Sequence, residues 1–275
     1  MDVKKRIAHI LIYAILIFLL FLCVFPFYVM IANSTHSTNE LYTGLKILPG
    51  TSFMENFRNL IGRVNIGRGF FNSFFVALSS TLLSAYFGMM TAFGLYEYKF
   101  KLKNLVYVLL VFSMMVPGQL GIIGLFRLSR DLGILDTYWP IILPSIANAG
   151  TIFFIYQYLE STMDEELLAA ARIDGSGEVL IFHKIIIPLA KPGVSTMVIF
   201  NFVSYWNNFF NPMILLFDEK KFTIPILMNN LNNGMLQDLG AKYTAIAISV
   251  IPIIVVYCFI SKHITEGMMA GAVKG

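Results

Sequence analysis

A charged stretch from Asp164 to Pro192 interrupts the apolar second half of the chain and carries its densest group of reactive side chains. It opens with acidic residues, which suit the partly positive first turn of a helix. Gly175 suits the end of such a helix. Thr162 and Glu165 have capping-box spacing. The stretch therefore predicts a short helix over roughly 163–173.

One face of this expected helix is narrow and smooth. Leu167, Ala170, Ala171 and Asp174 recur on it at helical spacing. Such a face favours docking in a groove of another protein, and we expect that role. The alternative is a helix lying on the bilayer, which would be expected to carry large apolar residues in place of the alanines.

A second helical piece is expected from Ser176 onward. Pro188 is expected to break it just before the chain returns to the membrane, because proline lacks the backbone N–H of a helix interior. Two short helices that meet at Gly175 and join a membrane span would act as a lever.

A second group of polar residues falls inside an apolar run over 193–217. Carboxamides in hydrocarbon need partners, which neighbouring helices, water or a ligand can supply. Amides and hydroxyls beside aromatic faces suit an uncharged polyol, so we expect a polar pathway here. Hydrogen bonding between helices stays open as the alternative. The expected pathway residues are Asn148 of the preceding run, Asn201, Tyr205, Trp206, Asn207 and Asn208.

The composition places these residues in a membrane protein. Hydrophobic residues make up 57% of the 275 residues, charged residues 13%, and the mean hydropathy is +0.72, unlike a soluble domain. Runs long enough to span a bilayer predict an all-α, polytopic protein with six transmembrane helices in one domain over 1–275. The predicted spans cover about 10–32, 69–94, 105–126, 138–159, 193–217 and 243–261.

The basic residues predict the orientation of the spans. Lys4, Lys5 and Arg6 precede the first span, and Lys99, Lys101 and Lys103 lie in a short loop. Because such residues favour the cytoplasm, both termini and the loop over 160–192 are expected there. Segments 33–68 and 218–242 are expected outside.

Other classes of function are disfavoured. No Asp, Glu, Lys or Arg lies inside the predicted spans, whereas a proton-driven carrier needs a titratable group along its path. No phosphate-binding glycine loop and no metal-ligand spacing occurs in the sequence, so neither nucleotide hydrolysis nor a metal site is expected. Cys23 and Cys258 fall in spans and indicate no disulfide. The small net charge of +4 makes nucleic acid an unexpected partner.

The charged stretch resembles the cytoplasmic signature loop of permease subunits of bacterial ATP-binding-cassette importers. Ala170, Ala171, Gly175, Ile185 and Pro188 match its spacing. Two positions depart from the motif, namely Ala169 in place of Glu and Ile187 in place of Leu. The acidic role is therefore expected from Glu165 or Glu166, one turn earlier.

The resemblance covers nearly the whole chain. In particular, the chain is similar to the shorter, six-span permease of maltose-type systems. The segments that carry it are Asn72–Ser73, Tyr96–Phe100, Met115–Gly118, Leu132–Thr137, Ile173–Gly175, Trp206–Phe209 with Pro212, and the tail Gly267–Gly275.

This resemblance implies a hetero-oligomer in the bacterial inner membrane. The expected partners are a second permease, two cytoplasmic ATPase subunits, an extracytoplasmic solute-binding protein, a sugar and membrane lipid. ATP and magnesium would be bound by the ATPases, and no cofactor by this chain, which is not an enzyme. The same machinery for a polar solute such as a polyol phosphate is the alternative. An ion-coupled carrier is disfavoured.

The resemblance also assigns the docking residues. The cytoplasmic loop would seat in an ATPase, and the tail from Gly267 would touch the ATPases as well. The implied coupling residues are Glu165, Glu166, Ala169, Ala170, Ala171, Asp174, Gly175, Ile185 and Pro188.

Overall fold

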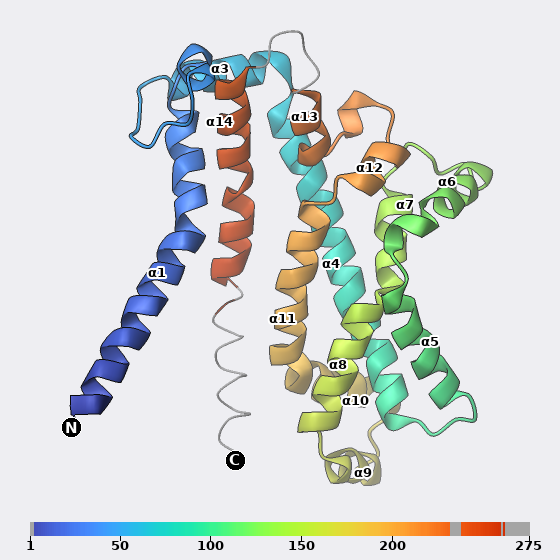
Figure 1. Ribbon diagram of the computed structural model, residues 1–275. Coiled ribbons are helices and arrows are strands. Elements are labelled where there is room, and N and C mark those ends of the chain that lie inside the picture. The colour runs from blue at the N-terminus through green and yellow to red at the C-terminus, as the bar shows by residue number, and fades with distance from the viewer. Residues whose placement is uncertain (1–2, 232–237, 260, 262–275) are drawn as a thin grey trace. The chain divides into compact units, whose positions relative to one another are not determined.

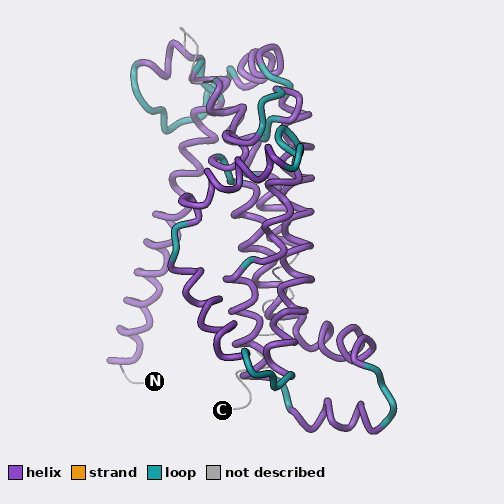
Figure 2. Tube along the Cα trace, turned by 90° about the vertical axis from the view of Figure 1, so that its right-hand side faces the viewer, coloured by secondary structure: helices purple, strands orange, loops and turns teal. Residues whose placement is uncertain are grey.

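The structure, a computed structural model, describes residues 3–231, 238–259 and 261. Within these residues every regular element is a helix, as Figure 2 shows by colour. The all-α class expected from the apolar runs is therefore confirmed. The tail Gly267–Gly275 lies outside the described residues.

The helices follow one another in the order labelled in Figure 1. Their bounds are α1 Val3–Ser34, α2 Thr38–Tyr42, α3 Phe53–Arg63, α4 Ile66–Glu97, α5 Lys103–Met115, α6 Ile122–Asp131, α7 Trp139–Ile142, α8 Ala149–Thr162, α9 Glu165–Ile173, α10 Glu178–Ile181, α11 Ile187–Trp206, α12 Phe210–Leu215, α13 Ile224–Asn230 and α14 Leu239–Ser249. Short 3₁₀ segments lie at Gly118–Gly121, Leu143–Ala147 and Glu219–Lys221, and a π-helical turn at Phe182–Ile186.

Five helices of the described residues are long and apolar enough to cross a membrane, and a bent pair raises the number to six. The five cover His9–Ser34, Ile66–Glu97, Trp139–Thr162, Glu178–Trp206 and Leu239–Phe259. The expected third span is the bent pair, in which Lys103–Met115 and Gly118–Asp131 meet at 97°. Pro117 lies at the break, where a helical backbone cannot continue unchanged.

The fifth span differs from its expected bounds of 193–217. Helical structure runs without a gap from Glu178 to Trp206, so Pro188 does not break it. The π-helical turn at Phe182–Ile186 precedes Pro188, which occupies the first turn of α11, where a missing N–H is tolerated. The expectation of two short helices ending at Pro188 was wrong for this local reason.

The described chain divides into two compact units. Unit 1 comprises residues 1–67 and 227–251, and unit 2 comprises 68–226 and 252–275. One domain over 1–275, as the sequence predicts, stays a prediction.

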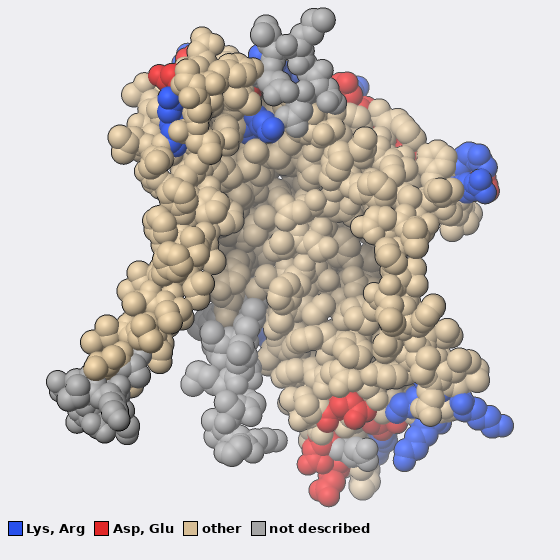
Figure 3. Space-filling view, in the orientation of Figure 1, with Lys and Arg blue, Asp and Glu red and all other residues tan. Residues whose placement is uncertain are grey.

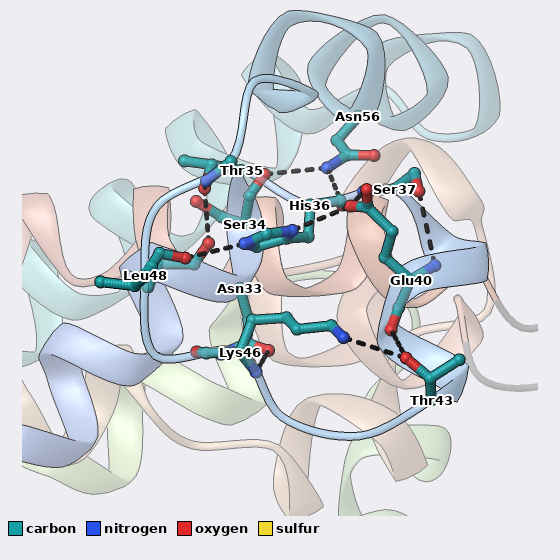
Figure 4. A network of polar contacts seen from close by, with 12 residues as sticks. Asn33, Ser34, Thr35, His36, Ser37, Glu40, Thr43, Lys46, Leu48 and Asn56 are labelled. Carbon is teal, nitrogen blue, oxygen red and sulfur yellow. Dashed lines mark hydrogen bonds and ion pairs between the residues drawn. The ribbon is translucent and has the colours of Figure 1, made fainter.

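In unit 1, α14 packs against α1, α2 and α3. Asn56 on α3 joins the elements, because its amide donates to the carbonyls of Ser34 and His36 at 2.8 Å each (Figure 4). The Asn33 amide donates to the Lys46 carbonyl at 2.9 Å. The bonds of Asn56 thus tie α3, and the bond of Asn33 ties the loop after α2, to the end of α1.

In unit 2, one hydrophobic cluster lies near α9 and another lies near α12. The first joins α4, α8 and α10 through the buried side chains of Phe93, Ile155, Leu159, Ile181 and others. Because α9 contributes Leu168, with no exposed surface, to this cluster, it is packed against the bundle and does not project as a free arm.

At the other end of unit 2, Asp136 connects two loops. Its carboxylate accepts hydrogen bonds from the N–H groups of Phe217 and Asp218 at 2.8 and 3.1 Å, and from Lys221 Nζ at 2.7 Å. Burial acts to raise the pKa of Asp136, but these bonds outweigh it and hold the pKa below its usual value. The segment after α12 is thereby held against the loop before α7.

Charged side chains of unit 2 gather at its two ends. On the face seen in Figure 3, acidic and basic groups lie beside α9 and the start of α5, and again at the far end at α6. The uncharged band between them is what a bilayer requires.

Candidate functional site

The N-terminus of α9 is capped by Asp164. The Asp164 carboxylate accepts a hydrogen bond from the Glu166 N–H at 3.0 Å. The Thr162 hydroxyl donates to the Tyr158 carbonyl at 2.7 Å, so Thr162 belongs to the end of α8. The expected capping box of Thr162 and Glu165 was wrong, because an acceptor two residues later takes its place.

The C-terminus of α9 is a Schellman motif. The Gly175 N–H donates to the Arg172 carbonyl, and the Ser176 N–H to the Ala171 carbonyl, both at 3.0 Å. Gly175 has φ +81°, a conformation that costs other residues energy. The predicted turn at Gly175 is confirmed, and it reverses the chain from α9 into α10.

The outward face of α9 is more apolar than its sequence pattern suggested. Glu166, Ala169, Ala170 and Asp174 are exposed, as expected of docking residues. Ile173 is 86% exposed, and the sequence prediction named it only within the segment Ile173–Gly175 and not as a docking residue. Its position opposite the buried Leu168 is the helical signal that could have found it.

Further apolar side chains extend this surface beyond the turn. Leu167 on α9 and Val179 and Leu180 on α10 are exposed large hydrophobic residues. Together with Ile173, Ala169 and Ala170 they form what we call the α9 face. Exposed large apolar side chains on α9, which lies outside the candidate spans, are typical of a protein interface.

The remaining predicted docking residues have mixed positions. Ala171 is half-buried against the cluster near α9, and Ile185 packs against the same cluster from the π-helical turn. Pro188 is exposed in the first turn of α11. Glu165 begins α9, and its side chain lies outside the described part. The predicted set thus includes outward and inward members.

Arg172 connects the end of α9 to two other elements. Its Nη1 donates to Glu97 Oε1 at the end of α4, and its Nε and Nη2 donate to the two carboxylate oxygens of Glu178 at 2.8 and 3.2 Å. Tyr98 donates to Glu178 Oε2 at 2.7 Å. Sequence reasoning gave Arg172 no partner, since Glu97 lies 75 residues away in the chain.

Asn201 lies in a buried polar cluster between α4, α8 and α11. Its amide donates to Ser84 Oγ at 3.1 Å and to Thr151 Oγ1 at 2.8 Å. Ser84 in turn donates to Thr151 at 3.1 Å. A Cβ added at Gly88 would approach a Thr151 methyl to 2.9 Å, so α4 and α8 meet closely here. Bonds of this kind hold helices together in membranes.

Asn148 and Tyr205 form a second pair of polar contacts. The Asn148 amide donates to the Tyr205 hydroxyl at 3.0 Å, while its carbonyl oxygen caps α8 by accepting from the Thr151 N–H at 2.9 Å. Both residues bond neighbouring helices, as the packing alternative requires.

The remaining predicted pathway residues lie at the end of α11 and differ in their burial. Trp206 is 2% exposed, with its ring stacked on Phe202 at a centroid distance of 5.8 Å. Asn207 caps the helix, is exposed, and donates to the Val203 carbonyl at 2.9 Å. Asn208 is half-buried and accepts from the Asn211 N–H at 3.3 Å. Asn207 therefore lies at the C-cap of α11, with its amide folded back onto the last turn, and Asn208 lies just after the helix.

A cavity of about 600 Å³ lies elsewhere in unit 2. Its lining is mainly apolar, with Phe75, Leu82, Tyr138, Trp139 and Ile142 among the contributors. None of the predicted pathway residues lines it. Within the described residues, no group of His, Cys, Asp and Glu side chains has metal-binding geometry.

A family of known proteins matches the part of the chain that contains these sites. Residues 84–269 match the family described as "Binding-protein-dependent transport system inner membrane component". This match includes the polar cluster and the whole of α9.

Two similar curated proteins come from Bacillus subtilis (strain 168). One is the arabinooligosaccharides transport system permease protein AraQ, 33% identical over 92% of each chain. The other is the polygalacturonan/rhamnogalacturonan transport system permease protein YtcP, 31% identical over 99% of this chain and all of that protein. Both similarities cover nearly the full length.

A solved structure shares the fold. It is the crystal structure of a bacterial ABC transporter involved in the import of the acidic polysaccharide alginate, matched with a TM-score of 0.79 at 24% identity. The match covers 95% of this chain and 98% of the other.

Proposed function

Because this chain belongs to the family of binding-protein-dependent transport system inner membrane components, we propose that it passes a sugar or oligosaccharide through a bacterial membrane. As a transport component it is not an enzyme, and we assign ATP hydrolysis to a partner. The oligosaccharide transport named for the similar proteins AraQ and YtcP supports the solute class.

The α9 face is the observation that carries the coupling role. It presents Ile173 and small side chains outward while Leu168 anchors the helix in the bundle. A helix that is exposed on one side and fixed on the other can transmit force from a bound partner. We assign this face to contact with an ATPase subunit, with Glu166 and Asp174 as its acidic rim.

The proposed mechanism is a shift between two conformations. ATP favours the conformation in which the ATPase pair is closed, and a ligand shifts an equilibrium by its difference in affinity for the two states. Displacement of α9 moves α10 across the turn at Gly175. Because helical structure continues from Glu178 to Trp206, the movement reaches the far end of α11 without passing a flexible joint.

The full assembly of this proposal has five further components. They are a second permease, two ATPase subunits, an extracytoplasmic solute-binding protein and the solute, with ATP and magnesium held by the ATPases. Residues 1–275 form one permease domain in this proposal. The α9 end and both termini face the cytoplasm.

For the solute pathway we assign contact to Asn207 and Asn208, which lie at the C-cap of α11 and directly after it. Asn148, Asn201, Tyr205 and Trp206 form the wall behind them, through the hydrogen bonds and ring stacking described above. Amide groups suit the hydroxyls of a carbohydrate, because they both donate and accept hydrogen bonds.

Cysteine crosslinking of the purified complex tests the coupling role. Cys23 and Cys258 are first replaced by Ala, and Ile173→Cys is then treated with a short bifunctional thiol-to-amine reagent. We expect an adduct with the ATPase subunit, identified by mass spectrometry of the joined peptides, because Ile173 is the most exposed of the large apolar side chains of the α9 face.

Lys220→Cys is the matched control, since Lys220 is exposed at the opposite end of unit 2. It should give no ATPase adduct. Absence of an adduct from Ile173→Cys in a complex that retains ATPase activity would refute the coupling role of α9.

A further inference from the structure

Arg172 occupies the point where three elements of unit 2 meet. Its guanidinium lies between the end of α4 at Glu97 and the start of α10 at Glu178, while its own backbone ends α9. Both nitrogens facing Glu178 are bonded, in the paired geometry that makes arginine–carboxylate contacts directional. A lysine, with one small ammonium group, cannot reproduce this arrangement.

Partial burial separates the Arg172–Glu97 pair from an ordinary surface ion pair, whereas Glu178 is 46% exposed. Glu97 is 15% exposed and Arg172 35% exposed, so solvent screens their attraction less than it screens a pair in open water. The hydrogen bonds that Arg172 donates to Glu178 and Glu97 raise the pKa of Arg172. The charge of the arginine is therefore permanent at any cellular pH.

Tyr98 completes the group as a donor. Burial, followed by its hydrogen bond to Glu178, raises the pKa of Tyr98 to about 12, so the hydroxyl keeps its proton. Arg172, Glu97, Glu178 and Tyr98, which we call the Arg172 clamp, thus join the α4 end to both sides of the turn at Gly175.

The other links of α9 do not supply this connection. Along the chain, α9 is joined only to α8 and, through Gly175, to α10. Leu168 and Ala171 touch the cluster that includes Phe93 and Leu95 of α4, but apolar contacts are non-directional and allow sliding. Directional bonds between α9 and α4 come from Arg172.

We propose that Arg172 is a positioning residue that carries displacement of α9 into α4, so that α4 moves together with α10 and α11 during transport. This inference rests on the proposed coupling role of α9. Without the Arg172 side chain, α9 would still bind the ATPase, but α4 would not move with it. ATP would then be hydrolysed without the full movement of the pathway.

The test measures solute uptake per ATP hydrolysed, with the whole complex in proteoliposomes. We expect Arg172→Gln to lower this ratio by at least about fivefold, the lower end of usual coupling between sites. Arg172→Lys should recover only part of the loss. Lys101→Gln, which removes one positive charge from an exposed loop at the same end, should keep the wild-type ratio.

A double-mutant cycle separates the clamp from a general loss of charge. If Glu97 acts through Arg172, the ratio for Arg172→Gln with Glu97→Gln together should equal that of Arg172→Gln alone. A further drop in the double variant, or a wild-type ratio in Arg172→Gln, would overturn the proposal.

Two milder variants decide the case in which Arg172→Gln fails to assemble. Tyr98→Phe removes one hydrogen bond of the clamp and Glu97→Gln removes one charge, and each should lower the ratio in the same direction. Wild-type ratios in both would overturn the proposal. The Ile173→Cys adduct distinguishes the two failures, because it reports ATPase docking whether or not the clamp matters.

Discussion

At the scale of single residues, the buried amide of Asn201 shows how a polar group is held at membrane depth. It bonds two hydroxyls, on α4 and α8, and is 5% exposed. An amide placed in hydrocarbon without such partners would cost several kcal/mol. The contacts of Asn201 thus serve helix packing first, and any effect on solute passes through the position of α11.

Comparing Asn201→Leu with Asn207→Leu tests this division between wall and contact. The first change should lower the free energy of unfolding by about 1–2 kcal/mol, because it removes the two buried hydrogen bonds that the Asn201 amide donates to Ser84 and Thr151. The second should change it by less than about 0.5 kcal/mol, since Asn207 is exposed, yet should slow uptake.

Thermal unfolding in detergent gives the stability of both variants, and proteoliposome uptake gives their transport. Unchanged stability of Asn201→Leu would contradict the packing role. Normal uptake by Asn207→Leu would exclude Asn207 from the solute pathway.

At the scale of elements, the loop between α2 and α3 is held by a histidine. The His36 ring bonds the Leu48 carbonyl and the Glu40 carboxylate, both at 2.8 Å (Figure 4). The bond to Leu48 is the largest cause that raises the pKa of His36 above 6.5, followed by the bond to Glu40, while burial opposes them. The protonated ring donates both bonds.

This raised pKa predicts a loop that loosens as pH rises. The stabilisation is fully present below pH 6.5 and is lost as pH passes upward through the raised pKa of the folded protein. Hydrogen exchange, corrected for the intrinsic rate at each pH, should show the amides of residues 44–50 better protected at pH 6 than at pH 8.5.

His36→Gln is the control for this pH dependence, because glutamine does not titrate. Protection in that variant should be the same at both pH values. Protection of the wild-type loop that is constant or rises with pH would contradict the role of the imidazolium.

At the scale of the whole molecule, the proposed orientation makes the two ends of unit 2 chemically distinct. The α9 end carries the α9 face, and the opposite end carries the loop tied by Asp136 and Lys221. Because the α9 end lies on the cytoplasmic side in this proposal, a membrane-impermeant thiol reagent should reach Ile173→Cys only in inverted vesicles.

Lys220→Cys should show the opposite pattern and be labelled only in intact cells or right-side-out vesicles. Both measurements use the variant without native cysteines. Labelling of Ile173→Cys from outside would reverse the topology and with it the assignment of an ATPase to the α9 face.

The sequence by itself determined the membrane class, the number of spans to within one bent pair, and the turn at Gly175. These features depend on sums over neighbouring residues, since a run of apolar side chains partitions into lipid wherever it lies, and a glycine permits a positive φ locally. The pattern around Ala170 and Ala171 is also local, so a helix could be predicted here before its surroundings were known, while its docking role stays a prediction.

Only the tertiary structure decided which side chains meet. Arg172 pairs with Glu97, Asn201 with Ser84 and Thr151, and Trp206 stacks in the bundle, all through partners from other helices. Pro188 is tolerated because a π-helical turn precedes it. The physical reason is that the partners of a polar or aromatic side chain come from other helices packed against it. The identity of these partners cannot be read from the residues next to it in the sequence.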